Sequence, residues 1–319
     1  MLPCGAGDLD FDGAAKYSRA TGGGTLLIWQ KGETRSDSTR GSSPTTPAEI
    51  FSITKSLTAL AWLARFSPET KVPVSLKSQE SLRAATLLSQ TSGISPGAGV
   101  IYRRKAKDVY SSALRLPRIA APGTAFAYGP AHYEILGGAL ERATNGQNAV
   151  TAILLRRLGI TPPAWRSDGR GGPFYSAGAF LTANDLLRIG RLILDHGRSG
   201  MFSPLIPADH LATAFRGTGA NPAYGLGFWL NARASKPGSQ ERDIEQALSL
   251  NLSTADWQHT CLSKAAPDDL VCMAGSNGQR VYISRSKNLV VVRTGSSRRF
   301  RDPDFLRILF RGSPPSRAR

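Results

Sequence analysis

The sequence is poor in cysteine, which excludes a fold built on a framework of disulfides. Its 319 residues contain only three cysteines, an odd number. Cys261 and Cys272 flank a short loop containing Pro and Asp, and they could form a disulfide in an oxidising compartment or remain two free thiols. Cys4, near the start of the chain, is expected to be free. No His or acid stands beside any of the three, so none is predicted to be a nucleophile.

Histidine is equally scarce, and its spacing argues against a metal site. His196, His210 and His259 lack a pattern such as His-x-x-x-His. We expect neither a metal nor another cofactor. His132 is interpreted as a histidine on the surface of a helix rather than a catalytic base.

Long hydrophobic runs are also missing. No apolar run reaches the roughly 18 residues that suggest a membrane-spanning helix, so no transmembrane segment is expected. Residues 1–8 lack the basic and apolar regions of a signal peptide. The protein is therefore cytosolic, or periplasmic or secreted after removal of a leader; the compartment stays open, and we favour the second alternative. A hydrophobic content of 41% with 20% charged residues is ordinary for a globular protein.

Acidic residues are outnumbered, 23 to 40, which gives a net charge of +17. Such an excess raises the possibility of nucleic-acid binding. The basic residues are scattered, however, apart from one cluster within residues 103–107 and another within residues 298–301. Zinc-finger spacing, RNP-like aromatic runs and a basic helix ahead of heptads are absent. We expect no specific nucleic-acid partner, but a solvated basic surface able to attract anionic envelope polymers or lipid headgroups.

The most informative segment that is present is Ser52-Ile53-Thr54-Lys55, where a strand-like run passes into a helical one. Residues three apart on a helix share one face, so the Lys55 amine can approach the Ser52 hydroxyl. A desolvated, partly neutral amine can remove the serine proton, and the first turn of a helix offers free N–H groups. Ser284-Arg285-Ser286-Lys287 has the same spacing but lies in a predicted hairpin turn. Ser52 could also be a simple helix cap.

The order of predicted elements is α/β at both ends and helical between. Helices are expected at residues 10–19, 52–64, 82–88, 106–114, 132–143, 148–158, 186–194 and 302–310, the helix from 186 being capped by the preceding Thr-Ala-Asn-Asp. Strands are expected at residues 25–30, 279–284 and 288–294. Residues 31–33 are predicted to form a hairpin turn, and residues 312–319 a loose tail.

Several segments, in order, resemble those of β-lactamase-related serine hydrolases. Besides the Ser-x-x-Lys segment they are LLSQTSGI at 87–94, PGTAFAYGPAHY at 122–133, GAFLTANDL at 178–186, YGLGFW at 224–229 and GSNGQ at 275–279. The resemblance runs from about Leu26 to Arg293. The family includes class C β-lactamases, D-alanyl-D-alanine carboxypeptidases, esterases and 6-aminohexanoate-oligomer hydrolases.

The resemblance implies a division of roles among the matched residues. Ser52 would be the nucleophile and Lys55 its general base. Tyr128 would share the proton and deliver it to the leaving group, and a phenol beside an ammonium would ionise more easily, so that the two groups titrate as a pair. The backbone N–H groups of Ser52 and Ser276 would form the oxyanion hole, and Gly275 would contribute to substrate binding.

Two departures from the family pattern bear on the substrate. Pro130 stands where the family has the Asn of Tyr-x-Asn, and proline offers no donor for a substrate carbonyl. Met273 stands where β-lactamases and carboxypeptidases have a Lys or His that helps hold a carboxylate. Arg280 could replace that charge only if it faced the site, and neighbouring strand residues point to opposite faces. An uncharged ester or secondary amide is therefore favoured over a peptidoglycan or β-lactam substrate.

Some alternatives remain open. Tyr224, Trp229 and Tyr175 could line the acyl pocket or simply pack. The loss of the Asn and the cation also fits a catalytically degraded family member that binds a wall peptide or a partner without turnover. The natural substrate and the oligomeric state are left open.

The resemblance implies an α+β, β-lactamase/transpeptidase-like fold that forms one catalytic unit over residues 1–319. An antiparallel sheet flanked by helices would come from an α/β lobe of about residues 1–66 and 170–319. A mainly helical lobe would comprise about residues 67–169. The active site would lie in the cleft between them.

Overall fold

The computed structural model describes residues 9–73, 82–103, 106–199, 204–250 and 252–311. Cys4, two members of the first basic cluster (Arg104 and Lys105) and the tail predicted at 312–319 lie outside these residues. At the centre is a six-stranded sheet, antiparallel throughout, with the strand order β2-β1-β11-β10-β9-β6. The strands span β1 (Gly23–Gln30), β2 (Glu33–Ser38), β6 (Trp229–Leu230), β9 (Val271–Gly275), β10 (Gln279–Ser284) and β11 (Leu289–Gly295).

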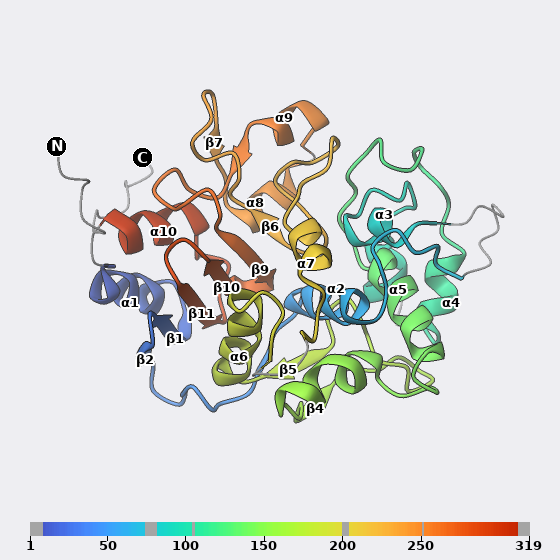
Figure 1. The fold of residues 1–319 in the computed structure, drawn as a ribbon, viewed down its shortest axis with the longest axis horizontal. Helices are drawn as coiled ribbons and strands as arrows, with labels where there is room; N and C mark the ends of the chain where they lie inside the picture. The colour runs from blue at the N-terminus through green and yellow to red at the C-terminus, as the bar shows by residue number, and fades with distance from the viewer. Residues whose placement is uncertain (1–8, 74–81, 104–105, 200–203, 251, 312–319) are drawn as a thin grey trace.

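The sheet is covered on both faces, and β1 shows how its sequence produces this. Successive side chains of a strand point to opposite faces. Leu26 and Ile28 belong to the hydrophobic cluster that contains side chains of α1 (Phe11–Ala20) and α10 (Asp302–Arg311). Leu27, between them, belongs to the cluster on the other face, with side chains of α2 (Ile53–Arg65) and α6 (Ala183–Leu194). Figure 1 shows α1 and α10 together beside the sheet.

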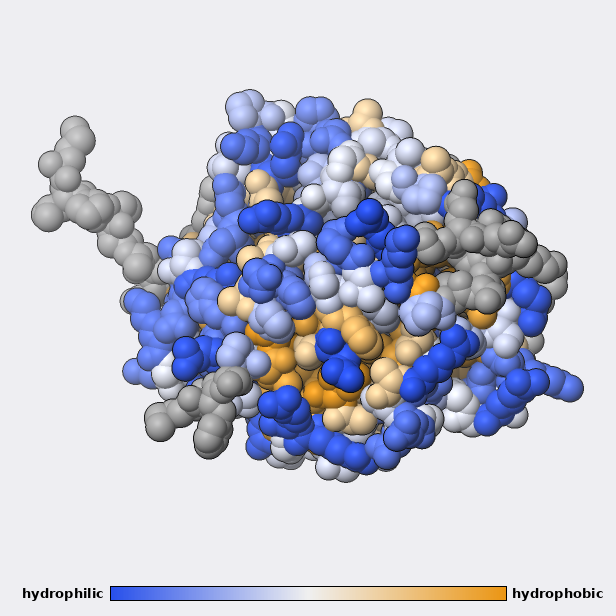
Figure 2. All heavy atoms as spheres, turned by 45° about the vertical axis from the view of Figure 1, so that its right-hand side comes forward, coloured by the Kyte–Doolittle hydropathy of each residue, from blue (hydrophilic) through white to orange (hydrophobic). Residues whose placement is uncertain are grey.

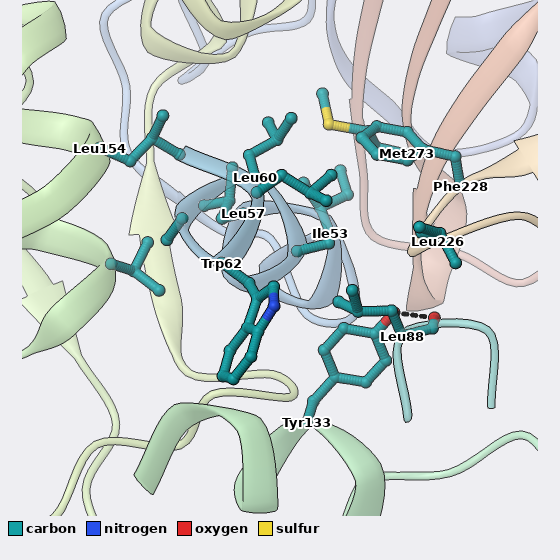
Figure 3. Packing of buried hydrophobic residues seen from close by; sticks show 14 of the residues in the cluster. Ile53, Leu57, Leu60, Trp62, Leu88, Tyr133, Leu154, Leu226, Phe228 and Met273 are labelled. Carbon is teal, nitrogen blue, oxygen red and sulfur yellow. Dashed lines mark hydrogen bonds between the residues drawn. The ribbon is translucent and has the colours of Figure 1, made fainter. Parts of the chain in front are cut away.

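Helix α2 is the central element of the larger cluster. All its residues from Ile53 to Leu63 are buried. Figure 3 shows Leu57, Leu60 and Trp62 projecting from α2 among side chains of other elements. On the side away from the sheet lie α3 (Ala84–Leu88), α4 (Val109–Leu114) and α5 (Ala131–Arg142), as Figure 1 shows. A helix so enclosed has little freedom to move, which makes its first turn a rigid place for reactive groups.

Shorter elements complete the fold. A small sheet has the order β3-β5-β4, and β7 pairs with β8 in parallel. Their bounds, and those of the remaining helices, are β3 (Ala48–Glu49), β4 (Ala164–Trp165), β5 (Ala179–Leu181), β7 (Gln240–Glu241), β8 (Thr260–Cys261), α7 (Ala208–Ala214), α8 (Ile244–Ser249), α9 (Thr254–Gln258), the π-helical turns Gly99–Arg103 and Thr151–Leu155, and the 3-10 turns Arg156–Leu158 and Ser276–Gly278.

Most elements expected from the sequence are confirmed, with shifted ends. The capped helix predicted from 186 is α6, where Thr182 and Asp185 form a reciprocal capping box. The helix predicted from 106 begins only at Val109, because Asp108 caps it there. The single helix predicted at 148–158 is instead a π-helical turn followed by a 3-10 turn. The α+β class is confirmed, while the lobe boundaries stay a prediction.

The surface carries the charge excess of the sequence. Figure 2 shows one face, on which hydrophilic residues surround a smaller apolar area. In the part of the chain that the structure describes, no helix is long and apolar enough to cross a membrane. Within the same residues, no cluster of His, Cys, Asp or Glu side chains could hold a metal ion.

Candidate active site

Ser52 lies at the N-cap of α2, in a tight backbone turn against which the end of β9 packs. The preceding residue, Phe51, has a φ of 46°, in the left-handed region that aromatic residues rarely adopt. Gly275, at the end of β9, approaches the same turn: a Cβ there would lie 2.2 Å from the carbonyl oxygen of Ile50. Only glycine allows this approach, and it brings Ser276 to the pocket that Ser52 also lines.

Lys55 lies one turn into α2, fully buried, with its amine directed at Ser52. Its Nζ is 2.9 Å from Ser52 Oγ and 3.0 Å from the backbone oxygen of Ser176. Burial lowers the pKa of Lys55 to about 7, although the carboxyl of Glu134 acts in the opposite direction. A substantial fraction of the amine is therefore neutral near pH 7, as a general base for Ser52 requires.

Tyr128 reaches the same serine from the loop before α5. The Ser52 side chain acts to lower the pKa of the Tyr128 phenol, and Lys55 Nζ lies 5.0 Å from the centre of its ring. Burial nevertheless raises the pKa of Tyr128 to about 12. The expectation that this phenol ionises easily is thus wrong, because burial disfavours the phenolate and the neighbouring amine is itself partly neutral. Near pH 7 Tyr128 is a proton donor.

Two of the three aromatic residues that could line the acyl pocket or simply pack are in contact with the Tyr128 ring. Trp229 and Tyr224 are buried, with ring centres 5.8 and 6.0 Å from that of Tyr128. Tyr175 is also buried, and its hydroxyl binds Glu141. These three side chains pack rather than form the pocket wall.

The pocket beside Ser52 has a volume of about 270 Å³. Its wall includes an ion pair between Arg166 and Glu49, whose Nε and Oε1 are 3.1 Å apart. The backbone N–H groups of Ser52 and Ser276 begin helical turns, where N–H groups have no partner within the helix. They are available to a developing oxyanion. The wall is formed by Glu49, Phe51, Ser52, Tyr102, Arg166, Phe174, Ala177 and Ser276.

Met273 and Pro130, expected near the substrate, do not line this pocket. Met273 is completely buried in the core, where Figure 3 shows it beside Phe228. Its face of β9 turns toward α2, so the side chain fills the core instead of the cleft. Pro130 is buried at the N-cap of α5, where its missing N–H costs no helical hydrogen bond.

Two further expectations concern charge near the site. Arg280 does not replace the missing cation: it is fully buried, and its guanidinium binds the Asp302 carboxylate with Nε 2.7 Å from Oδ1. The expectation that His132 lies on a helix surface is wrong, because the side chain is fully buried. Burial lowers the pKa of His132 to about 4, so the ring is neutral.

Sequence reasoning missed Glu134, an acid buried on α5. Its carboxylate accepts hydrogen bonds from the backbone N–H of Tyr175 and of Ser176, at 3.0 and 3.1 Å. The signal was a single acid within an otherwise apolar run, residues 131–140, all of which are buried. Tyr102 was missed as well; its hydroxyl lies 2.7 Å from Ser176 Oγ. Cys261 and Cys272 are both buried and free.

Comparison with solved structures supports the fold. A Bacillus anthracis protein provisionally named a 6-aminohexanoate-dimer hydrolase has a TM-score of 0.67 at 16% identity, over 90% of this chain and 76% of that one. The octameric penicillin-binding protein homologue from Pyrococcus abyssi has a TM-score of 0.63 at 17% identity, over 95% and 76%. EstCE1, a hydrolase with promiscuous acyltransferase activity, has a TM-score of 0.63 at 15% identity, over 90% and 92%.

At these identities the likeness shows the fold alone. No curated protein matches the sequence significantly. The sequence matches the profile of the β-lactamase family over residues 11–308, nearly the whole chain. The chain therefore belongs to the β-lactamase family, a family of serine hydrolases.

Proposed function

We propose that the protein is a serine hydrolase that cleaves a carboxylic ester or secondary amide through an acyl-enzyme. The observation that carries this proposal is the position of the Lys55 amine, 2.9 Å from Ser52 Oγ, together with a pKa that burial lowers to about 7. If Ser52 were simply a helix cap, it would not need the buried Lys55 amine beside its hydroxyl. The Ser52 side chain makes no capping hydrogen bond to α2, which also argues against that reading.

The reaction begins when the neutral Lys55 amine takes the Ser52 proton as Oγ attacks the carbonyl carbon. The carbonyl oxygen becomes an oxyanion, held by the N–H groups of Ser52 and Ser276. Collapse breaks the bond to the leaving group, which takes the phenolic proton of Tyr128, and the Lys55 ammonium returns a proton to the phenolate. Water then attacks the acyl-enzyme, gives its proton to the same pair, and Ser52 Oγ leaves with a proton.

The pocket wall favours an uncharged acyl group. Phe51, Tyr102 and Phe174 supply aromatic surface, and the arginine of the wall, Arg166, is paired with Glu49. Met273 offers no cation in any case. A carboxylate on the substrate would find no free cation within this wall.

A specific observation supports the alternative of a D-alanyl-D-alanine carboxypeptidase or β-lactam hydrolase. A second pocket, of about 410 Å³, also borders Ser276 and contains Arg298 and Arg301 as well as Glu245. A substrate extending past Ser276 could place a carboxylate there. We rank this alternative second, because Arg301 Nη1 already donates to two backbone oxygens and Glu245 offsets part of the positive charge.

A matched assay of p-nitrophenyl butyrate and nitrocefin tests the proposal. We expect ester hydrolysis well above β-lactam hydrolysis, and loss of both in Ser52→Ala. The paired change Arg298→Gln with Arg301→Gln should leave butyrate hydrolysis intact. A nitrocefin rate far above the ester rate, reduced by this paired change, would establish the alternative. No turnover of either substrate, with no labelling of Ser52 by a fluorophosphonate, would favour a family member that only binds.

The basic surface carries a separate proposal about partners. We propose that the charge of +17 gives only nonspecific attraction to anionic envelope polymers. Retention on heparin should then vanish at roughly 0.1–0.2 M salt. Retention that persists well above this range would indicate a specific anionic partner.

A further inference from the structure

The segment Tyr175–Ser176 joins the helix that carries the candidate base to the helix that carries Glu134. Both of its N–H groups donate to the Glu134 carboxylate on α5, at 3.0 and 3.1 Å, and Ser176 Oγ donates to the same group at 2.5 Å. Both of its carbonyls accept from α2: Thr58 Oγ1 binds the oxygen of Tyr175 at 2.8 Å, and Lys55 Nζ binds that of Ser176 at 3.0 Å.

We propose that Glu134 is a positioning residue for Lys55, a role that rests on the proposed function of that lysine. Glu134 clamps Ser176, whose carbonyl holds the amine beside Ser52, and its negative charge favours the ammonium over the neutral amine. The acid reaches the base through the backbone of Ser176, whose N–H binds Glu134 and whose carbonyl binds Lys55. The position of the lysine therefore depends on a residue that the catalytic segments do not contain.

The charges of the two groups are linked in the same cluster. Burial raises the pKa of Glu134 to about 7, against the hydrogen bonds from Ser176 and Tyr175. Burial lowers the pKa of Lys55 to about 7, against the attraction of Glu134. Both groups therefore titrate near neutral pH, and the state with one proton on the pair is either an ion pair or a neutral acid with a neutral amine. Burial favours the uncharged form, and that form contains the free amine that Ser52 requires.

The other titratable groups facing this cluster are neutral near pH 7. Burial lowers the pKa of His132 to about 4 and raises that of Tyr128 to about 12. Burial also raises the pKa of Tyr102, whose hydroxyl binds Ser176 Oγ. Among the residues that the structure describes, Glu134 is therefore the carboxyl group whose charge acts on Lys55.

The experiment measures the pKa of Lys55 directly, so that it does not depend on turnover. The Cε resonance of lysine labelled with ¹³C is followed with pH in the wild type, in Glu134→Gln and in Glu141→Gln, with Lys55→Met assigning the signal. Glu141 is a matched control, because it lies two turns along the same helix and binds the side chain of Tyr175. Hydrolysis of p-nitrophenyl butyrate is recorded over the same pH range.

Removing the carboxylate that favours the ammonium should lower the pKa of Lys55, by about one unit in Glu134→Gln, and leave it unmoved in Glu141→Gln. The rise of kcat/KM with pH should shift by the same amount. An unmoved Lys55 pKa in Glu134→Gln would overturn the electrostatic half of the proposal, because the carboxylate would then have no effect on the protonation of the amine. If Glu134→Gln lowers the pKa of Lys55 but the wild-type protein hydrolyses no substrate, the link between Glu134 and Lys55 stands and the proposed hydrolase function is rejected.

If the Glu134→Gln variant does not fold, Glu134→Asp tests the positioning role instead. The shorter side chain keeps the charge but withdraws it from Ser176, so hydrolysis should slow at least about tenfold, by analogy with misplaced catalytic groups. A wild-type rate and a wild-type pH profile in this variant would contradict the positioning role.

Discussion

The side-chain oxygen of Gln90 accepts a hydrogen bond from the backbone N–H of Gly129 at 2.6 Å. The backbone oxygen of Gln90 accepts from Ala127 at 3.0 Å, so the chain is held on both sides of Tyr128. Its Nε2 donates to the hydroxyl of Tyr224, 3.1 Å away, which packs against the same tyrosine. The buried Gln90, which is not itself one of the proposed reactive residues, thus fixes the position of the Tyr128 phenol.

Replacing Gln90 by alanine should therefore impair catalysis through Tyr128. The buried N–H of Gly129 would lose its partner, which costs about 1–3 kcal/mol of stability. Because a small misplacement of a reactive group has large effects, kcat/KM should fall roughly 10- to 100-fold. Steady-state kinetics and thermal unfolding measure both effects. Gln147→Ala, at an exposed position, is the control and should change neither.

The buried lysine should cost the protein stability. Because burial lowers the pKa of Lys55 from 10.5 to about 7, the unfolded chain binds a proton between these pH values that the folded protein does not. The free energy of unfolding contributed by this group therefore rises with pH across that window. Lys55→Met should abolish hydrolysis and yet stabilise the fold at pH 7 by roughly 2–4 kcal/mol.

That gain should shrink to about 1 kcal/mol or less as the pH approaches 10, because the unfolded lysine, whose pKa is 10.5, then also begins to lose its proton. Urea unfolding at pH 7 and pH 10 measures the difference. Lys16→Met, on the exposed side of α1, should change the stability by no more than about 0.5 kcal/mol at either pH. A gain in Lys55→Met that is the same at both pH values would contradict the lowered pKa.

The close approach of Gly275 to Ile50 predicts a severe effect of one added methyl group. In Gly275→Ala the Cβ would lie 2.2 Å from a backbone oxygen, so β9 must move away from the turn before Ser52. The N–H of Ser276 would then leave the candidate oxyanion hole, and kcat should fall about 100-fold or more. In Gly219→Ala, where no atom lies within 4 Å of the added Cβ, activity should be unchanged. Equal activity of the two variants would show that the Ser276 N–H does not contribute to the oxyanion hole.

The sequence was sufficient to predict the parts of the site whose residues lie close together along the chain. Ser52 and Lys55 are three residues apart on one helix, so their contact follows from helical geometry. Tyr128 was found only because its whole segment resembles that of a known family. The strand positions were also predictable, since alternation in β1 and the hairpin of β10 and β11 are short-range patterns.

Long-range packing was beyond the sequence for physical reasons. Whether Met273 faces the cleft or the core depends on which side of β9 meets α2, and no local pattern in a strand buried on both faces reveals this. Glu134 and Ser176 are 42 residues apart. Their contact arises from the packing of a loop between two helices, and the sequence could at most mark Glu134 as an isolated acid in an apolar helix.

Reaction with a fluorophosphonate tests the central claim most directly, because it requires an activated serine but no knowledge of the natural substrate. The account predicts a single adduct, located on Ser52 by peptide mass mapping, absent in Ser52→Ala and slowed at least about 100-fold in Lys55→Met. Its rate should increase as the pH rises through about 7, the pKa of Lys55. An adduct on Ser284, or labelling of Ser52 that is indifferent to Lys55, would contradict the account.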